Sequence, residues 1–408
     1  MPDVLTDQLP LFPFRNPADD PFQPVTPADR ATLDAPVSRV RLPVGGWTWL
    51  VTRHADVREL LRSDAFSADM YQSGFPLLRP LPPASPESRR GSFIRMDGAD
   101  HQRLRRMLTA EFMIKNIRRI EPLIADTVER ALDELAAAGS PADLVEHFAL
   151  PVPSLVICHL LGVPYADHAF FQDRSRVLLD RGAPPEQGRA AVSELRDYLG
   201  ALVETERSAG ARGDNLLSRL IPERVDTGEL DVTELVGMAL LLLIAGHETT
   251  ANMIGLSTLL LMRHREHFAA LRDDPALADS MVEELLRYLT IVRTGLPRVA
   301  LRDTEIGGQP IRAGEGAMAL LSLANRDDAA FTGDPEGFDP YREAHQHVAF
   351  GFGVHQCIGQ PLARAELRVA LVRLARRFPR LELAADPASL PARDMSIVYG
   401  LAALPVRW

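Results

Sequence analysis

Near the C-terminus, the chain reads Phe350-Gly351-Phe352-Gly353-Val354-His355-Gln356-Cys357-Ile358-Gly359, and a helical pattern begins at Gln360. Gly351 and Gly353 permit positive φ angles and a close approach of the backbone to its surroundings. The amide N–H groups at the start of the following helix favour the anionic form of the Cys357 sulfur. The segment therefore predicts a rigid loop that presents one thiolate to a metal, as haem iron requires when dioxygen is to be cleaved. The alternative is a buried cysteine in an ordinary turn between a strand and a helix.

This loop resembles the haem-binding signature of the cytochromes P450, Phe-Gly-x-Gly-x-His-x-Cys-x-Gly. All six specified positions match, and they are Phe350, Gly351, Gly353, His355, Cys357 and Gly359. A dinucleotide-binding fingerprint does not fit, because the residue three places after Gly353 is Gln356. The resemblance implies haem b as the cofactor, with Cys357 as the iron ligand. It also implies a mainly α fold with a small β portion, in which the haem lies between a long central helix and the helix after the cysteine loop.

The composition fits one large domain. Hydrophobic residues make up 46% of the 408 residues, and no Ser/Gly-rich linker, charge block or internal repeat divides the chain. We therefore expect a single domain over residues 1–408. The net charge of −10 argues against nucleic acid as a partner. Cys158 and Cys357 lie far apart, so a disulfide scaffold is not expected and a reducing cytoplasm is compatible.

The N-terminus and the apolar runs bear on localisation. Residues 1–8 have neither a basic segment nor an apolar core, so no secretory signal is expected. The longest apolar run, Met238 to Ala245, is far shorter than the roughly 20 residues that span a bilayer. One lysine, Lys115, among 45 basic residues is typical of a GC-rich bacterial coding sequence. We expect a soluble cytoplasmic protein of bacterial type without a membrane anchor.

Hydrophobic periodicity and turn residues predict a chain made mostly of helices, with a few strands towards each end. The expected elements are a hairpin over 37–52 with a two-residue turn at Gly45-Gly46, a helix near 54–62, successive helices over 99–290 with the longest at about 231–263, strands over 294–323 with a Gly307-Gly308 turn, and a helix at about 360–377. Residues 71–93 are irregular and rich in proline, so we expect a substrate-facing loop there. A disordered segment without a role is the alternative.

The longest helix contains the run Ala245-Gly246-His247-Glu248-Thr249-Thr250. Ala245, Glu248 and Thr249 share one face, because they are spaced three and four residues apart. An acid beside an alcohol suits a relay of protons to dioxygen at an iron. The run resembles the family's Ala-Gly-x-(Asp/Glu)-Thr element, which implies Glu248 as the proton donor and Thr249 as the hydroxyl on the oxygen side. The alternative is a buried, salt-bridged glutamate beside threonines that bond their own helix.

Gly246 is unexpected in the middle of a helix, where glycine costs about 1 kcal/mol relative to alanine. A flat cofactor lying against the helix is one explanation, and a tight crossing of two helices is the other. The resemblance places Ala245 and Gly246 beside the cofactor. A zinc-protease site does not fit, because His247 and Glu248 lack the second histidine of HExxH.

Glu284 and Arg287 form an acid–base pair three residues apart on a helix. They resemble the family's Glu-x-x-Arg, whose third partner is implied to be Arg342. We expect a buried network that supports the cysteine loop and takes no part in the chemistry. Glu283, one position earlier, is expected to be solvated.

Basic residues must converge on the two propionates of a haem. His101 and Arg105 lie one helical turn apart and resemble the family's His-x-x-x-Arg. Arg298 and His355 complete the implied set of four. For any one of these residues alone, a surface cation is the alternative.

The substrate pocket is expected to draw on the 71–93 loop, on the helix junction at 170–190 and on several apolar positions. These positions are Leu242, Ala245, Ile291, Val292, Thr294, Ile397 and Val398. Their mostly apolar character predicts a hydrophobic small-molecule substrate. The resemblance to actinobacterial enzymes implies a secondary metabolite, such as a macrolide or polyketide, or a xenobiotic.

The predicted function is a P450 monooxygenase, an oxidoreductase that hydroxylates or epoxidises its substrate with one atom of O2 and reduces the other atom to water. The sequence holds no flavin or iron–sulfur motif, so electrons are expected from NAD(P)H through a ferredoxin reductase and a ferredoxin. Four arginines predict a basic docking face for an acidic ferredoxin, and they are Arg103, Arg106, Arg364 and Arg368. The alternative is that these arginines only solvate exposed helix faces. We expect a monomer.

Two other functions stay open. An enzyme of the same fold could reduce nitric oxide directly with a nicotinamide cofactor, and a non-enzymatic haem sensor or carrier is the second possibility. The pair Glu248 and Thr249 favours oxygen activation over both.

Overall fold

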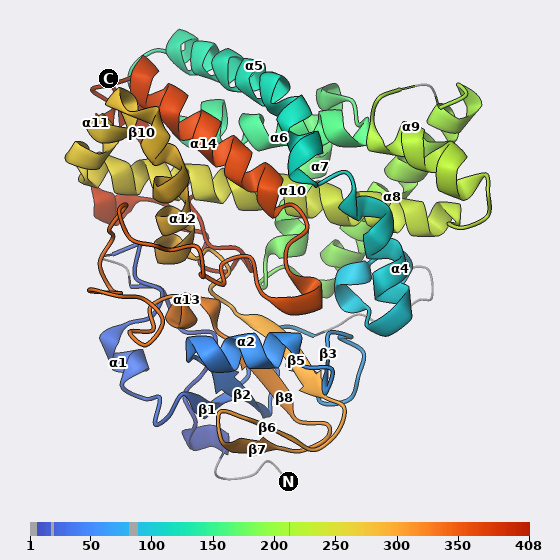
Figure 1. Ribbon diagram of the computed structural model, residues 1–408, viewed down its shortest axis with the longest axis vertical. Coiled ribbons are helices and arrows are strands. Elements are labelled where there is room, and N and C mark those ends of the chain that lie inside the picture. Colours follow the sequence, from blue (N-terminus) through green and yellow to red (C-terminus); the bar gives the residue numbers. More distant parts are fainter. Residues whose placement is uncertain (1–5, 18–19, 81–88, 212) are drawn as a thin grey trace.

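The computed structural model describes residues 6–17, 20–80, 89–211 and 213–408. Figure 1 shows a larger helical region and a smaller region that holds the main sheet and the N-terminal part of the chain. The helices are α1 (Pro27–Arg30), α2 (His54–Arg62), α4 (Gly98–Thr109), α5 (Ile114–Ala138), α6 (Pro151–Leu161), α7 (His168–Leu179), α8 (Pro185–Ser208), α9 (Leu216–Leu220), α10 (Val232–Arg263), α11 (Arg265–Asp273), α12 (Ala278–Leu289), α13 (Leu321–Ala324) and α14 (Gln360–Arg377). The strands are β1 (Val37–Arg41), β2 (Trp47–Val51), β3 (Phe66–Ser67), β4 (Ala142–Asp143), β5 (Leu296–Ala300), β6 (Thr304–Ile306), β7 (Gln309–Ile311), β8 (Gly316–Ala319), β9 (Glu382–Leu383) and β10 (Pro405–Arg407). The prediction of a mainly α fold with a small β portion is confirmed.

The main sheet combines strands from the N-terminal part of the chain, residues 37–67, with strands from residues 296–319. Its strand order is β1-β2-β8-β5-β3, in which β2 and β8 run parallel and the other neighbours run antiparallel. The predicted hairpin over 37–52 is present, with Arg39 opposite Trp49. The two-residue turn was wrong, because β1 ends at Arg41 and β2 begins only at Trp47. Pro43 has no N–H to donate to the ladder, so the connection widens to residues 42–46 and closes with a hydrogen bond from the Leu42 N–H to the Gly46 carbonyl, at 3.0 Å.

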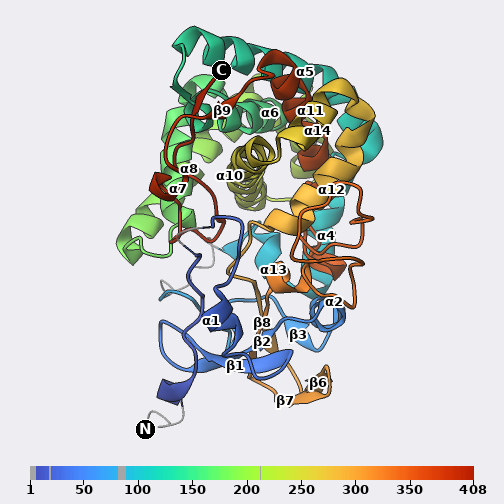
Figure 2. The ribbon, with the colours of Figure 1, turned by 90° about the vertical axis from the view of Figure 1, so that its left-hand side faces the viewer.

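Helix α10 is the centre of the helical region. Figure 2 looks nearly along its axis and shows the other helices arranged around it, and it contacts α6, α8, α12 and α14. Asp231 caps its first turn in a capping box with Glu234, which explains why the helix begins where the sequence predicts. Among the described helices, α10 alone is long and apolar enough to cross a membrane, but these neighbours cover it as the core helix of the region.

The cysteine loop lies between two hydrophobic cores. The helical core packs against Phe350, and the core between the sheet and α2 packs against Phe352. Because the loop has an aromatic anchor in each core, its position is set by both regions of the molecule. Helix α14 follows directly with the predicted bounds, and α2 also matches its predicted bounds.

The predicted 71–93 loop is described in part. Residues 81–88 lie outside the described residues. In the described part, Arg79 donates hydrogen bonds to the carbonyls of Leu178 and Asp180, at 3.2 and 2.9 Å. The loop is therefore attached to the end of α7.

Candidate functional site

The loop from Phe350 to Gly359 turns tightly around its glycines. Gly351 and Gly353 have φ angles of 70° and 74°, and the Cys357 N–H donates to the Phe350 carbonyl at 2.9 Å. A Cβ added to Gly353 would lie 2.6 Å from the Leu61 carbonyl oxygen at the end of α2. Glycine is therefore required at 353 both by the backbone angle and by the close approach to α2.

Cys357, at the end of this loop, is exposed as a residue, although many protein atoms surround its sulfur. The protein around the sulfur raises the pKa of its thiol, because desolvation outweighs the backbone N–H groups of Gly359 and Gln360 and the positive charges of Arg105 and Arg364. These four groups all favour the thiolate but do not by themselves offset the desolvation of the sulfur, so an anionic sulfur here needs a further positive partner.

The four predicted propionate ligands lie together beside the cysteine loop. The rings of His101 and His355 are 4.2 Å apart between centroids, and Arg105 Nη2 donates to the Gln356 carbonyl at 2.5 Å. Burial, His355, Arg105 and Arg298 together lower the pKa of His101 to about 4. Burial also lowers the pKa of Arg298, to about 10. Residues far apart in the chain thus form one cationic cluster.

This cluster has an unsatisfied polar atom. His101 Nε2 is buried and has no hydrogen-bond partner among the residues that the structure describes. Buried polar groups are normally hydrogen-bonded, and the atom lies among cations, so an anionic oxygen is the partner that suits it. The cluster therefore fits the propionates of a haem.

Sequence reasoning missed two members of this cluster. Arg95 is close enough to lower the pKa of Arg298, and burial lowers its own pKa. Asp97 pairs with His355 at 3.6 Å, and although burial opposes it, hydrogen bonds from His355, Ser67 and the Ala68 N–H lower the pKa of Asp97 to about 2. Both residues lie shortly before α4, which carries His101. This closeness in the chain was the available signal that they would lie near His101 in the fold.

A cavity of about 530 Å³ opens beside the cationic cluster. Its lining is largely polar and includes Arg95, Asp97 and Glu234, but not Cys357 or Thr249. It is therefore a polar recess next to the candidate site and does not match the predicted apolar substrate pocket.

One face of α10 is exposed although most of this helix is buried. Ala245 is exposed and Thr249 is half-buried, and Thr249 Oγ1 donates to the Ala245 carbonyl at 2.7 Å. Since the hydroxyl proton is used within the helix, its oxygen lone pairs remain available to accept a hydrogen bond. The helix thus presents a small face, formed by Ala245 and the Thr249 hydroxyl, beside the buried polar residues His247 and Glu248.

Gly246 is explained by helix packing. A Cβ at this position would lie 2.7 Å from Cγ1 and Cδ1 of Ile157 on α6. Of the two explanations from sequence, the tight helix crossing is therefore the one with a direct contact.

Glu248 is buried and forms ion pairs with two arginines. Its Oε2 accepts from Arg393 Nη1 at 2.7 Å, and its Oε1 lies 3.8 Å from Arg176 Nε. His247 Nε2 is 4.0 Å from the same Oε1. The side chains of Arg393 and Arg176 are 18% and 42% exposed, so charged groups connect this buried carboxylate with the surface. Glu248 is therefore a buried, salt-bridged glutamate whose charged partners extend towards the surface.

The predicted network of Glu284, Arg287 and Arg342 is buried and fully connected. Arg287 binds Glu284 with two hydrogen bonds of 2.7 Å, and Arg342 Nε lies 3.3 Å from the same carboxylate. Arg287 also donates to the carbonyls of Asn325, Pro335 and Gly337. The network joins α12 to the segment that leads into the cysteine loop.

The expectation that Glu283 is solvated was wrong. Glu283 is buried and pairs with Arg364 Nε at 2.5 Å and with His347 Nε2 at 3.3 Å. Burial opposes ionisation, but hydrogen bonds from His347 and Arg364 lower the pKa of Glu283 to about 2. The reason is tertiary, because Arg364 lies over the Phe350 ring at 4.7 Å and draws Glu283 into the packing of the loop.

The segments predicted to form the substrate pocket meet through backbone hydrogen bonds. The Ile397 N–H donates to the Leu179 carbonyl, and the Tyr399 N–H donates to the Ile291 carbonyl, both at 2.8 Å. Thr294 Oγ1 donates to the Ile397 carbonyl at 3.3 Å. Leu242, Ile291, Thr294 and Val398 are buried, whereas Val292 and Ile397 are half-buried.

Arg293 of the same segment points elsewhere. It lies over the Tyr399 ring at 3.7 Å and donates to Asn16 and to the carbonyls of Pro21 and Gln23. Its role is to hold the N-terminal segment.

The family model described as Cytochrome P450 matches residues 185–391. Cytochrome P450-SU2 of Streptomyces griseolus is 48% identical over 411 residues, which cover 100% of this chain and 98% of the relative. Vitamin D3 dihydroxylase of the same organism is 44% identical over 407 residues, which cover 99% and 98% of the two chains. The solved structure of a mycinamicin VIII C21 methyl hydroxylase from Micromonospora griseorubida, bound to mycinamicin VIII, matches with a TM-score of 0.90 and 39% identity over 98% of this chain and 100% of that chain. The similarity therefore extends along the whole chain.

Proposed function

The chain belongs to the cytochrome P450 family, and we propose that it oxidises a hydrophobic small molecule with electrons from NAD(P)H, delivered by a ferredoxin reductase and a ferredoxin. It is an oxidoreductase of the monooxygenase class, as its relatives are. In a hydroxylation, one C–H bond, O2, two electrons and two protons give an alcohol and water. The observation that carries the assignment is the Cys357 thiol beside a cationic cluster with an unpaired, buried His101 nitrogen.

The cysteine loop before α14 and the cationic cluster beside it would hold haem b, which would supply an iron at which dioxygen is activated. We assign Cys357 Sγ as the ligand of this iron, and Phe350, Gly351 and Gly359 as the residues that shape the loop around it. His101, Arg105, Arg298 and His355 would hold the propionates, and we add Arg95 to this set. His101 Nε2, which is buried and has no partner among the described residues, would donate a hydrogen bond to a propionate oxygen.

On α10, we assign proton handling to Glu248 and Thr249. Thr249 Oγ1 would accept a hydrogen bond at the exposed face of α10, which also carries Ala245, and Gly246 follows Ala245 on the side packed against α6. Glu248 would hold and release a proton, while Arg393 and Arg176, which stay protonated, would hold the carboxylate at the end of a charged path from the surface. A buried carboxylate with a route to solvent is suited to general acid–base work.

The substrate class follows from the pocket and from the relatives. We assign the pocket to Leu242, Ala245, Ile291, Val292, Thr294, Ile397 and Val398, a set with one hydroxyl and no charge. A macrolide-type or other secondary metabolite, or a xenobiotic of similar polarity, fits this lining. The names of two of the three relatives quoted above describe hydroxylations, which supports oxygenation over nitric oxide reduction and over haem sensing.

The docking face for the ferredoxin rests on fewer free cations than the sequence predicts. Arg103 is paired with Glu234, Arg364 with Glu283, and Arg368 with Glu121 and Asp279. Arg106, in contrast, is exposed and makes no ion pair with any described residue. We therefore assign the main electrostatic contact with the ferredoxin to Arg106.

For the protein as a whole, we propose a monomer with one domain over residues 1–408. We further propose that it is cytoplasmic and has no membrane or nucleic-acid partner.

Turnover in a purified system tests the function. The haem-loaded protein, NAD(P)H, ferredoxin and ferredoxin reductase are incubated with a hydrophobic substrate chosen by its shift of the haem absorption, under ¹⁸O₂. One ¹⁸O atom per product molecule is expected. Product formed without O2 or without ferredoxin, or NADH oxidation driven by nitric oxide alone, would contradict the proposal.

A further inference from the structure

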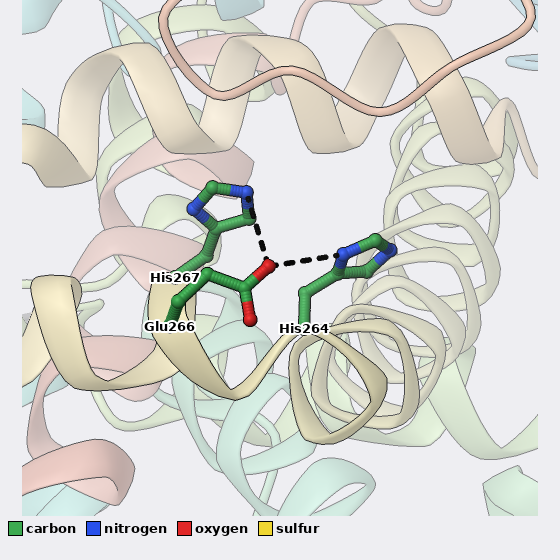
Figure 3. A group of neighbouring side chains, drawn as sticks. All are labelled: His264, Glu266 and His267. Carbon is green, nitrogen blue, oxygen red and sulfur yellow. Dashed lines mark ion pairs between the residues drawn. The ribbon is translucent and has the colours of Figure 1, made fainter.

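Two histidines and a glutamate gather where α10 meets α11. His264 is the single residue between the two helices, and Glu266 and His267 lie in the first turn of α11. Figure 3 shows one oxygen of Glu266 between the two imidazole rings. Glu266 Oε1 is 3.6 Å from His264 Nδ1 and 3.8 Å from His267 Nε2.

The spacing of these atoms is close to that of a metal site. The three donor atoms all lie within 4.8 Å of one another. Zinc–ligand bonds of about 2.0–2.2 Å in a tetrahedron place neighbouring ligand atoms roughly 3.3–3.6 Å apart. The two N···O separations are therefore nearly correct, and a small rotation of the imidazole rings would shorten the third.

The local structure holds the donors in place. The His264 carbonyl accepts from the N–H groups of His267 and Phe268, at 3.0 and 3.1 Å, so the helix start fixes both histidines. Phe338 packs against both rings, with centroids 5.5 Å from His264 and 5.8 Å from His267. Ordering the two imidazole rings around an ion would therefore cost little additional entropy, whereas Glu266, with its side chain 68% exposed, would be ordered by the ion.

Neighbouring cations do not oppose an ion at this position. Arg263 lies over the Phe22 ring and pairs with Asp20, and Arg265 donates to the carbonyls of Pro379 and Leu381. Both guanidinium groups have partners away from the cluster.

We propose that His264 Nδ1, Glu266 and His267 Nε2 bind a divalent transition-metal ion of the zinc class, with water in the remaining position. Two imidazoles and one carboxylate suit zinc and its neighbours, whereas magnesium and calcium prefer all-oxygen sites. The ion would cross-link the end of α10 to α11 and would stabilise this junction. The site is independent of the oxidation chemistry.

Zinc titration of the haem-loaded protein, after EDTA treatment and removal of the chelator, tests the site. Calorimetry should show one saturable equivalent of Zn²⁺, and excess Mg²⁺ should not compete. His264→Ala, His267→Ala and Glu266→Gln should each weaken this binding at least about tenfold. His159→Ala, at an exposed histidine on α6, should bind Zn²⁺ as the wild type does.

Thermal unfolding gives a second measurement. Zn²⁺ should raise the midpoint of the wild type and of His159→Ala, but not that of the three site variants, because only an ion bound to the folded state stabilises it. The metal-free midpoints show whether each variant is folded, and Glu266→Gln, at an exposed position, keeps the test decisive if a histidine variant fails to fold. Absence of a saturable equivalent in the wild type, or unchanged affinity in the site variants, would overturn the proposal.

Discussion

Glu248 on α10 and Arg393, 145 residues later in the chain, form an ion pair with 2.7 Å between Oε2 and Nη1. The Arg393 N–H donates to the Gly400 carbonyl at 2.9 Å, so the arginine is anchored in the segment that carries Ile397 and Val398. The acid assigned to proton handling is thus tied to a segment assigned to the substrate pocket. Movement of that segment would change the environment of the carboxylate directly.

Glu248→Gln should slow turnover by about 100-fold while substrate affinity is retained, because the amide keeps the shape of the side chain but cannot exchange a proton. Product formation and the substrate-induced change in haem absorption measure the two quantities. Normal turnover by Glu248→Gln would remove this residue from the mechanism.

Arg393→Ala should lower the free energy of unfolding by about 3 kcal/mol, since it removes the closer partner of a buried charge.

Cys357→Ser should lose the absorption that thiolate-ligated ferrous haem shows with carbon monoxide, because serine does not supply a thiolate. Cys158→Ser is the matched control, since burial raises the pKa of Cys158 to about 12 and the residue lies in the helical core. The control should keep the wild-type spectrum. If the effects of the two substitutions were reversed, the ligand assignment would be wrong.

Thr249→Ala should bind substrate and consume NAD(P)H but release more hydrogen peroxide and less product, because the exposed face of α10 loses its hydroxyl. The ratio of product to NAD(P)H consumed measures this coupling. Thr258→Ala is the control, since Thr258 makes the same bond to the carbonyl four residues earlier, at 2.8 Å, but is buried. Equal coupling in the two variants would contradict a role for Thr249.

Glu366 on α14 should make stability depend on pH. Burial raises the pKa of this carboxyl from 4.5 to about 8, and a hydrogen bond with Thr250 opposes the shift only partly. Below pH 4.5 both the folded and the unfolded state are protonated at this group. Between pH 4.5 and 8 only the unfolded state ionises, so the free energy of unfolding falls as pH rises, and above pH 8 the fall levels off.

Glu366→Gln should remove this contribution, which is on the order of 3 kcal/mol between pH 5 and pH 8. Urea unfolding of the wild type and the variant at both pH values measures it as the difference between their pH slopes. Parallel slopes would show that Glu366 is ionised in the folded protein or is reached by water.

Arg106→Glu should slow the first electron transfer from ferredoxin without a change in substrate affinity. The rate for the wild type should also fall with salt, as the Debye length shortens from about 30 Å at 0.01 M to about 8 Å at 0.15 M. Stopped-flow reduction measures both effects. Rates indifferent to salt and to this substitution would place the docking site elsewhere.

Arg364→Glu should behave differently, although both residues were predicted to dock the ferredoxin. It would place a second carboxylate beside buried Glu283 and remove the guanidinium from the Phe350 ring. We expect a loss of about 3 kcal/mol in the free energy of unfolding and a disturbed haem spectrum. A variant as stable as the wild type, with only slower reduction, would restore Arg364 to the docking face.

The sequence was sufficient to predict the features that are determined by residues close to one another in the chain. The glycines of the cysteine loop require positive φ angles, and the α14 boundary follows at once. The start of α10 depends on a capping box within four residues. His101 and Arg105 lie together because helical spacing places them one turn apart.

Other features were decided by contacts between residues distant in the chain. Glu283 looks like a surface residue until Arg364, 81 positions later, draws it into the packing of the cysteine loop. Arg95 resembles any exposed cation until Arg298 is placed beside it.

The sequence by itself therefore determined the turns of the cysteine loop and the boundaries of α2, α10 and α14, because backbone angles, caps and helical spacing act over a few residues. The chemistry followed from the resemblance of its motifs to those of the family. Only the tertiary structure decided that Gly246 serves a crossing with Ile157, that Glu248 is paired with Arg393, and that most of the expected docking arginines are already neutralised. The free energy of a charge or of a glycine depends on what packs against it. That partner is chosen by the fold, often from more than a hundred residues away.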